Sequence, residues 1–521
     1  MHARQIMAVT GSRYMPPWLP QPGYGDFKDE RRLTDGQIRA IADWVRNGAP
    51  EGDPATEPGP PQFTTGWQLG PPDMVIEAPR PFPMAGSGAD VFWNFIFAPE
   101  IRSTRYVRAI EIRVGSARNI HHANILLDRL GTSRRLESVQ GAGFPGMDVV
   151  VERNPFDPDS HFLFWKSGSA PYSEPDGFSW RLDPGNLLIL NTHIQPTGKP
   201  EEVRPVIGLY FTDKPPTRFP ILMELEHDDA LDIPPGDRDL MISDDFRMPV
   251  DSDLLAIYPH AHYLGKLLEA YATLPDGQRK WLIRIPNWGL NWQAVYRYRE
   301  PVFLPAGSIV SMRFHYDNSA ANPRNPNSSS KRVRAGNQAS DEMGHLWLQV
   351  LPRGRGDHRR SLQEALLRHR LEENPNDFST HLNLGAVMLS RLDGQGAVTT
   401  LEEAVRLDPS RPEAHDMLGS ALGSLGRSQE ALRQFRLAIK ADPEYVNARY
   451  DLAGALAKSG DYAGAVEEFQ YVIAKFPEVA SLQRRFGELL QRAGRSAEAA
   501  SALDKAAALE KARAAGGTDA R

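Results

Sequence analysis

Histidine and methionine side chains supply the clearest candidate chemistry in this sequence. They fall in four short motifs of the middle of the chain, HHANILLD, NTHIQPTG, PHAHYLG and DEMGHLWL, which contain His121, His122, His193, His260, His262 and Met343. Together they offer one site of three imidazoles and one site of two imidazoles with a thioether. A thioether is a soft ligand that suits Cu(I), so the second combination favours a metal that cycles through that state.

The spacing of the HxH motif fits a β-strand, because residues two apart face the same side of a strand. His260 and His262 can therefore reach one metal while Ala261 points away. The same alternation places Met343, His345 and Trp347 on one face of a second strand.

Adjacent residues on a regular strand point to opposite sides. A metal shared by His121 and His122 therefore requires a β-bulge or a twisted strand end, and we predict such an irregularity there. Each motif alone is also compatible with a packing role. The alternative that all six side chains are structural in a plain β-sandwich stays open on spacing alone.

The composition excludes several classes of protein and site. The chain has 521 residues, a net charge of −6 and no cysteine. Its acidic balance gives no reason to expect a nucleic-acid partner, and no apolar run approaches a membrane span or a secretory signal. Without cysteine there are no disulfides, no thiolate zinc sites and no covalent haem attachment through CxxCH. Any metal must be held by His, Met or carboxylate.

Composition shifts divide the chain into parts. Residues 1–50 contain one clear helix pattern, capped by Thr34 and closed near Gly48, and residues 51–66 are a Pro- and Gly-rich linker. From 67 to 352, short apolar runs punctuated by turns predict an all-β region. Both halves of this region, 67–215 and 216–352, have a histidine eight residues after a turn glycine, which predicts two related β-sandwiches, jelly-roll-like in kind.

The last part is a helical repeat with a 34-residue period. Proline recurs at 375, 409, 443 and 477, alanine at 397, 431, 465 and 499, and a large apolar residue at 384, 418, 452 and 486. This is the tetratricopeptide pattern and predicts a solenoid over residues 361–511, after a linker at 353–360 and before a disordered tail at 512–521. Such solenoids offer a groove for a protein partner, and the alternative is a packing or dimerisation appendage.

With these motifs in place, residues 67–352 resemble the copper type II, ascorbate-dependent monooxygenases, the family of peptidylglycine alpha-hydroxylating and dopamine beta-monooxygenases. The resemblance implies two copper ions. His121, His122 and His193 would hold the electron-supplying copper, and His260, His262 and Met343 the oxygen-binding, catalytic copper. It also implies insertion of one atom of O2 into a C–H bond of a small-molecule or peptide substrate, with ascorbate or another one-electron donor.

The sequence departs from the peptide-amidating members at three places. Tyr258 stands where those members have an arginine two residues before HxH, and His345 and Trp347 stand where they have asparagine and tyrosine. A glycine-extended peptide is therefore not the expected substrate. Tyr258, His315, His345 and Trp347 are candidates for a supporting shell, and His315 and His345 for rival ligands.

The N-terminal segment resembles the distal half of a class I cytochrome c, in which Met15 would be the axial ligand. Because CxxCH is absent, we predict no haem in this chain. We expect either that the true start lies upstream of this sequence or that the segment is a remnant of a cytochrome c. The layout looks like bacterial members, so we expect a periplasmic or other extracytoplasmic location. The alternative to a monooxygenase is a catalytically silent copper-binding scaffold that acts through its repeats.

Overall fold

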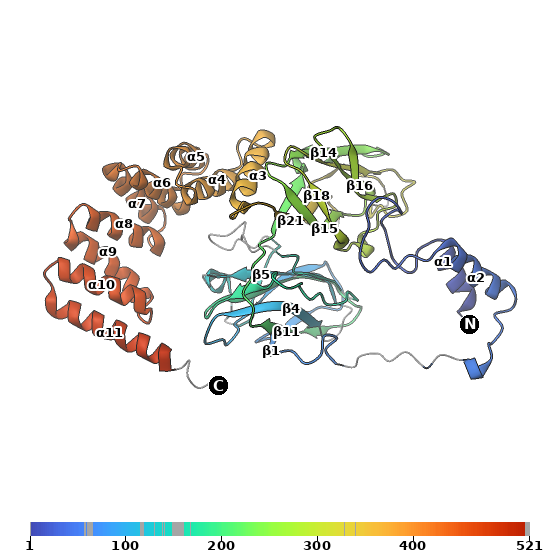
Figure 1. Cartoon of the computed structure of the whole chain (residues 1–521), viewed down its shortest axis with the longest axis horizontal. Helices are drawn as coiled ribbons and strands as arrows, with labels where there is room; N and C mark the ends of the chain where they lie inside the picture. The colour runs from blue at the N-terminus through green and yellow to red at the C-terminus, as the bar shows by residue number, and fades with distance from the viewer. Residues whose placement is uncertain are drawn as a thin grey trace. The chain divides into compact units, whose positions relative to one another are not determined.

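The computed structural model describes residues 2–56, 59, 66–114, 119–129, 131–137, 139, 141–147, 161–166, 168–327, 329–338 and 340–515. The chain divides into two compact units, Met1–Arg359 and Arg360–Arg521. The first contains short N-terminal helices followed by antiparallel sheets, and the second is helical (Figure 1). The predicted fold class, β-sandwiches followed by a helical repeat, is confirmed.

The first half of the β region forms two larger sheets and one small one. Its strands are β1 (Met74–Glu77), β2 (Phe82–Met84), β3 (Val91–Phe97), β4 (Arg105–Val114), β5 (Ile120–Asp128), β6 (Phe144–Pro145), β7 (Phe164–Lys166), β8 (Trp180–Leu182), β9 (Leu187–Ile194), β10 (Glu201–Val203) and β11 (Pro205–Thr212). The strand orders are β1-β11-β4-β8, β6-β3-β9-β5-β7 and β10-β2. Phe95 and Leu190 of one large sheet share a core with Val107, Trp180 and Leu209 of the other, which makes this half a sandwich.

The second half is built in the same way. Its strands are β12 (Ile221–Glu226), β13 (Asp232–Ile233), β14 (Leu240–Arg247), β15 (Ser252–Ala261), β16 (Gly265–Thr273), β17 (Arg279–Ile285), β18 (Tyr296–Leu304), β19 (Ile309–Tyr316), β20 (Val333–Arg334) and β21 (Gly344–Pro352). The strand orders are β12-β21-β15-β18, β14-β19-β16-β17 and β13-β20. At Gly344 the two larger sheets approach so closely that a Cβ would lie 2.2 Å from Cδ1 of Ile242.

The two halves share the turn that the sequence repeats. Gly185 and Gly307 have φ of +86° and +87°, and a strand begins two residues after each, β9 in one half and β19 in the other. Only glycine adopts this left-handed conformation without strain. The histidines that follow, His193 and His315, lie on corresponding strands.

The N-terminal segment has two helices, α1 (Ala3–Gly11) and α2 (Asp35–Arg46). Thr34 and Gln37 form a capping box at the start of α2, as its sequence predicts. The sequence did not predict α1, whose N-cap residue makes no side-chain cap hydrogen bond. Between the helices the chain packs on β18, where Phe27 pairs with Tyr298 and the Lys28 N–H donates to the Arg297 carbonyl at 2.8 Å.

The second unit is a stack of paired helices. They are α4 (Phe378–Ser390), α5 (Gly394–Leu407), α6 (Pro412–Ser424), α7 (Ser428–Ala441), α8 (Val446–Lys458), α9 (Tyr462–Lys475), α10 (Ala480–Arg492) and α11 (Ser496–Ala515), preceded by α3 (Arg359–Glu373). Each repeat proline lies two residues after a helix ends, and the repeat alanines are all buried. The predicted tail overlaps the end of α11, and its residues 516–521 lie outside the described residues, as do residues 57, 58 and 60–65 of the predicted linker at 51–66. None of the described helices has the length and apolar character that a membrane span requires.

Candidate metal centre

A β-bulge brings three histidines together in the first sandwich. In the pairing of β5 with β9, Ile120 lies opposite Ile194 and His122 opposite His193, so the register shifts at His121. The predicted irregularity is thus confirmed. The Nδ1 atoms of His121 and His122 are 3.1 Å apart, and each of the three rings offers a nitrogen within 4.8 Å of the others. Nitrogens that surround one small cation at about 2.0 to 2.1 Å lie at comparable separations.

The ring of His193 is held by neighbouring side chains. Nε2 of His193 lies 2.9 Å from Oδ2 of Asp90, and Phe92 stacks on the ring at a centroid distance of 4.6 Å. Its Nδ1 is buried and has no hydrogen-bond partner among the described residues. Buried polar atoms are normally paired. This orphaned nitrogen, in a ring oriented by a carboxylate, fits a metal ligand.

The three imidazoles favour their neutral forms. Burial lowers the pKa of His121 to about 4, with further lowering from His193 and Lys166. Burial likewise lowers the pKa of His122 and of His193, although Asp90 partly opposes this for His193. Neutral imidazoles are the form that binds metals. Protons should therefore compete for His121 at lower pH than for a free histidine.

Asp90 provides a first test of this cluster. Replacing it with asparagine removes the charge that orients and polarises His193, and we expect metal affinity at the cluster to fall roughly tenfold to a hundredfold. Competition titration of Cu(II) against a chelator measures this. Asp176→Asn, at an exposed carboxylate paired with Lys214 in the same sandwich, is the matched control and should leave affinity unchanged. Equal affinities in all three proteins would contradict the role of Asp90.

The HxH motif lies at the end of β15 in the second sandwich. Nδ1 of His260 lies 2.7 Å from Oε1 of Gln293, and Nδ1 of His262 lies 3.0 Å from the Asp341 carbonyl oxygen. When each Nδ1–H donates to its oxygen, Nε2 carries the free lone pair of each ring. The ring centroids are 5.3 Å apart. Burial lowers the pKa of both imidazoles, so this pair also offers neutral ligands.

Met343 is tied to the same place through its neighbour. The carboxylate of Glu342 is fully buried and accepts hydrogen bonds from the N–H groups of His262 at 2.7 Å, Leu264 at 2.9 Å and Met343 at 3.2 Å. The backbones of His262 and Met343 therefore lie against one carboxylate oxygen. Met343 itself is 4% exposed. The structure thus brings the HxH pair and the methionine, 81 positions apart at His262 and Met343, into one neighbourhood.

The two clusters lie within electrostatic range of each other. Burial is the main cause that lowers the pKa of His122 and His262, and a histidine of the opposite cluster lowers each further, His260 for His122 and His193 for His262. A row of rings also links them. Centroid distances are 5.8 Å from His122 to Phe164, 5.0 Å from Phe164 to Tyr258 and 6.1 Å from Tyr258 to His260.

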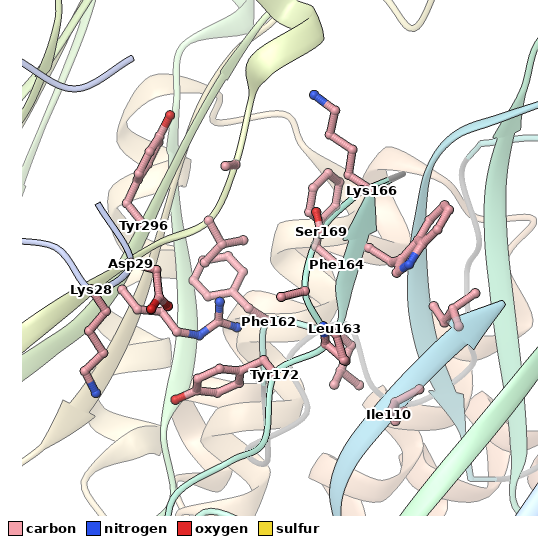
Figure 2. A pocket seen from close by; sticks show the side chains of 18 of the residues that line it. Lys28, Asp29, Ile110, Phe162, Leu163, Phe164, Lys166, Ser169, Tyr172 and Tyr296 are labelled. Carbon is pink, nitrogen blue, oxygen red and sulfur yellow. The ribbon is translucent and has the colours of Figure 1, made fainter. Parts of the chain in front are cut away.

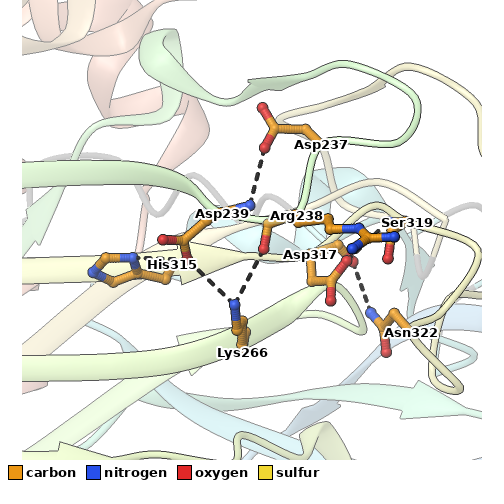
Figure 3. Close-up of polar contacts among 8 residues, drawn as sticks. All are labelled: Asp237, Arg238, Asp239, Lys266, His315, Asp317, Ser319 and Asn322. Carbon is orange, nitrogen blue, oxygen red and sulfur yellow. Dashed lines mark hydrogen bonds and ion pairs between the residues drawn. The ribbon is translucent and has the colours of Figure 1, made fainter.

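The supporting residues proposed from the sequence fall in different places. Tyr258 lies beside the HxH pair, where its hydroxyl donates to Oε1 of Gln293 at 2.7 Å. Trp347 lies opposite Tyr258 in the pairing of β15 with β21. His315 lies on β19 of the other sheet and contacts Asp239 at 3.2 Å, in a polar group with Lys266 (Figure 3). Its chain neighbours Phe314 and Tyr316 are buried in the core, so His315 faces away from it.

His345 pairs with His260 across the strands but is engaged by acidic groups. Its nitrogens lie 3.2 Å from Glu224, 3.5 Å from Glu226 and 3.2 Å from Asp228. Burial opposes the charged ring, yet the carboxylates of Glu224 and Asp228 hold the pKa of His345 well above its usual value. A protonated imidazole has no lone pair to give. The acidic neighbours therefore favour the protonated form of His345, although with Glu224 and Glu226 it also has the composition of a metal-binding group.

Three residues that contact the candidate ligands were not predicted from the sequence: Asp90, Gln293 and Glu342. Of the three, only Glu342 could have been recognised from the sequence. It is an acidic residue directly before Met343 and an apolar strand, and a carboxylate in a buried position requires a hydrogen-bond partner. Asp90 and Gln293 are 103 and 33 positions from the histidines that they contact. No local pattern connects residues so far apart in the sequence.

Comparisons with known proteins concern the repeats. A family model described as tetratricopeptide repeat matches residues 417–480. Among solved structures, a crystal structure of MamA is 26% identical with a TM-score of 0.28 and covers 31% of this chain and 98% of that one. For a MamA segment from Desulfovibrio magneticus RS-1 the values are 24%, 0.28, 30% and 89%. For YrrB, described as a TPR protein with an unusual peptide-binding site, they are 21%, 0.27, 30% and 79%. None of the curated proteins compared with the chain matches it.

Proposed function

We propose that the β region is a two-copper monooxygenase that hydroxylates a C–H bond with O2 and electrons from ascorbate or a similar one-electron donor. One observation carries the proposal. Two separate imidazole clusters, one with an orphaned buried nitrogen on His193, are connected by a row of aromatic rings that runs from His122 to His260. The four sequence motifs that resemble the copper type II family supply the residues of both clusters.

The residues divide the work by ligand type. His121, His122 and His193 would hold one copper through nitrogen alone, and His260, His262 and Met343 would hold the other with a thioether that favours Cu(I). Copper bound there would supply one-electron transfer and the activation of O2. The protein's own contribution is to keep the imidazoles neutral by burial and to fix their orientation through Asp90, Gln293 and the Asp341 carbonyl.

A second candidate function is that of a copper-binding interaction protein whose β region catalyses no reaction. The tetratricopeptide repeats favour it, because they are matched by a family model and such repeats commonly bind peptides or proteins. Both functions include copper, so metal binding alone does not separate them. The difference lies in reaction with O2.

Oxygen consumption separates the two functions. The full chain is loaded with copper, ascorbate is added, and O2 uptake is followed with a panel of aromatic and aliphatic compounds while products are analysed by mass spectrometry after incubation under 18O2. A monooxygenase gives uptake that requires substrate and one 18O atom in the product. Copper binding with no substrate-dependent uptake and no labelled product would leave the interaction protein as the function.

A further inference from the structure

A cavity of about 360 Å³ lies beside the HxH pair but is distinct from both histidine clusters. Its lining comes from the N-terminal loop with Trp18, from residues 162–166 and 168–172 with parts of β4, β5 and β8 in the first sandwich, and from residues 292–297 of the second. The rings of Phe162, Phe164, Tyr172 and Tyr296 surround it, with Asp29 to one side (Figure 2). Cavities of roughly 300 Å³ or more with aromatic walls are typical of small-molecule sites.

Three of the residues that line this cavity each carry a buried hydrogen-bond donor. The donors are Nε1 of Trp18, Nε2 of Gln293 and Nε of Arg297, each buried and without a partner in the part of the chain that the structure describes. Gln293 is 1% exposed, and its Oε1 is already engaged by Tyr258 and His260. A buried donor that is left unpaired is destabilising. Three such donors around one space indicate an occupant rich in acceptor atoms.

The charges around the cavity favour an anion. Two lining residues, Asp29 and Glu174, are anionic. Five are cationic: Lys28, Arg31, Arg108, Lys166 and Arg297. Glu174 also lies 3.3 Å from His161. The Arg297 guanidinium stacks over the Tyr172 ring, with Cζ 3.6 Å from the ring centroid.

We propose that this cavity binds a small planar aromatic carboxylate, whose ring packs among the aromatic walls while its oxygens accept from Trp18, Gln293 and Arg297. The site requires no copper and does not depend on the proposed oxygenase function. Through Gln293, which contacts both the cavity and His260, an occupant would lie one side chain away from the HxH pair.

Isothermal titration calorimetry on the metal-free full chain tests the proposal. The probes are benzoate, 2-naphthoate and indole-3-acetate, with 2-naphthamide and benzylamine as matched neutral and cationic compounds and cyclohexanecarboxylate as the non-aromatic acid. At least one aromatic acid should bind about tenfold or more tightly than its neutral, cationic and non-aromatic counterparts. No binding by any of the acids, or equal binding of the amide or the amine, would overturn the proposal, and the donors would then be satisfied by water.

Two variants locate the binding. Trp18→Phe keeps the ring and removes its N–H, and Arg297→Lys keeps the charge and removes Nε; each should weaken binding of the acid about tenfold or more. Trp44→Phe is the control, since Trp44 lies on α2 outside the cavity and its Nε1 donates to the Pro50 carbonyl. Circular dichroism checks that each variant is folded. Unchanged affinity in both Trp18→Phe and Arg297→Lys would place the acid elsewhere and overturn the assignment.

Discussion

Substituting alanine for His121 or for His260 is expected to remove one of about two coppers from each chain. The three-histidine cluster and the HxH pair are held by different strands and different supporting groups, Asp90 in one case and Gln293 in the other. Loss of one imidazole should therefore weaken one site and spare the other. Elemental analysis after dialysis gives the stoichiometry. Electron paramagnetic resonance of the Cu(II) form shows which site remains.

His315→Ala is the matched control for this experiment. His315 lies on β19, in the same β region as the HxH pair but on a different sheet. Its ring contacts Asp239. Its removal should leave about two coppers bound. Equal copper content in the wild type and in all three variants would defeat the ligand assignment, and loss of copper from His315→Ala alone would show that the metal lies on the other sheet.

The repeat unit could be predicted almost completely from the sequence. A 34-residue period marks the same structural position four times. The proline equivalent to Pro375 and the alanine equivalent to Ala397 recur in each repeat, and this agreement identifies the repeat. The structure places the prolines just past helix ends and buries the alanines at helix contacts. The predicted bounds differ from the structure at both ends, because α3 begins at Arg359 within the predicted linker and an alanine-rich stretch continues α11 to Ala515.

The sequence predicted the histidines that the structure brings together at the candidate site, but not the residues that support them. His260 and His262 follow strand alternation, and the HH motif required a bulge that the structure contains at His121. The partners of these rings depend on how distant strands meet. Nothing near His345 in the sequence indicates that Glu224 and Asp228 surround it, because those residues reach it only through the pairing of β12 with β21. Tertiary contacts thus decide which histidines can be neutral ligands.

Glu342→Ala is expected to cause a large loss of stability, about 3 to 5 kcal/mol in the free energy of unfolding. The fully buried carboxylate accepts three backbone N–H groups, from His262, Leu264 and Met343. Without it each donor would be left unpaired at about 1 to 3 kcal/mol, partly relieved by relaxation. Urea denaturation of the metal-free full chain measures the loss. Glu300→Gln, at an exposed carboxylate on β18, serves as the control and should change stability by less than about 0.5 kcal/mol.

The same carboxylate should make stability depend on pH, and the sign distinguishes its role. Burial raises the pKa of Glu342 to about 8, although the three N–H groups lower it, whereas an unfolded chain has about 4.3. The folded state therefore holds the proton to higher pH. Stability of the wild type relative to Glu342→Gln should be greatest below about pH 4 and fall as pH rises toward 8, by at most about 1.4 kcal/mol per unit. A stability difference that stays constant between pH 5 and about 9 would mean that the three donors, not burial, control this group, and that Glu342 holds His262 and Met343 together as a permanent anion.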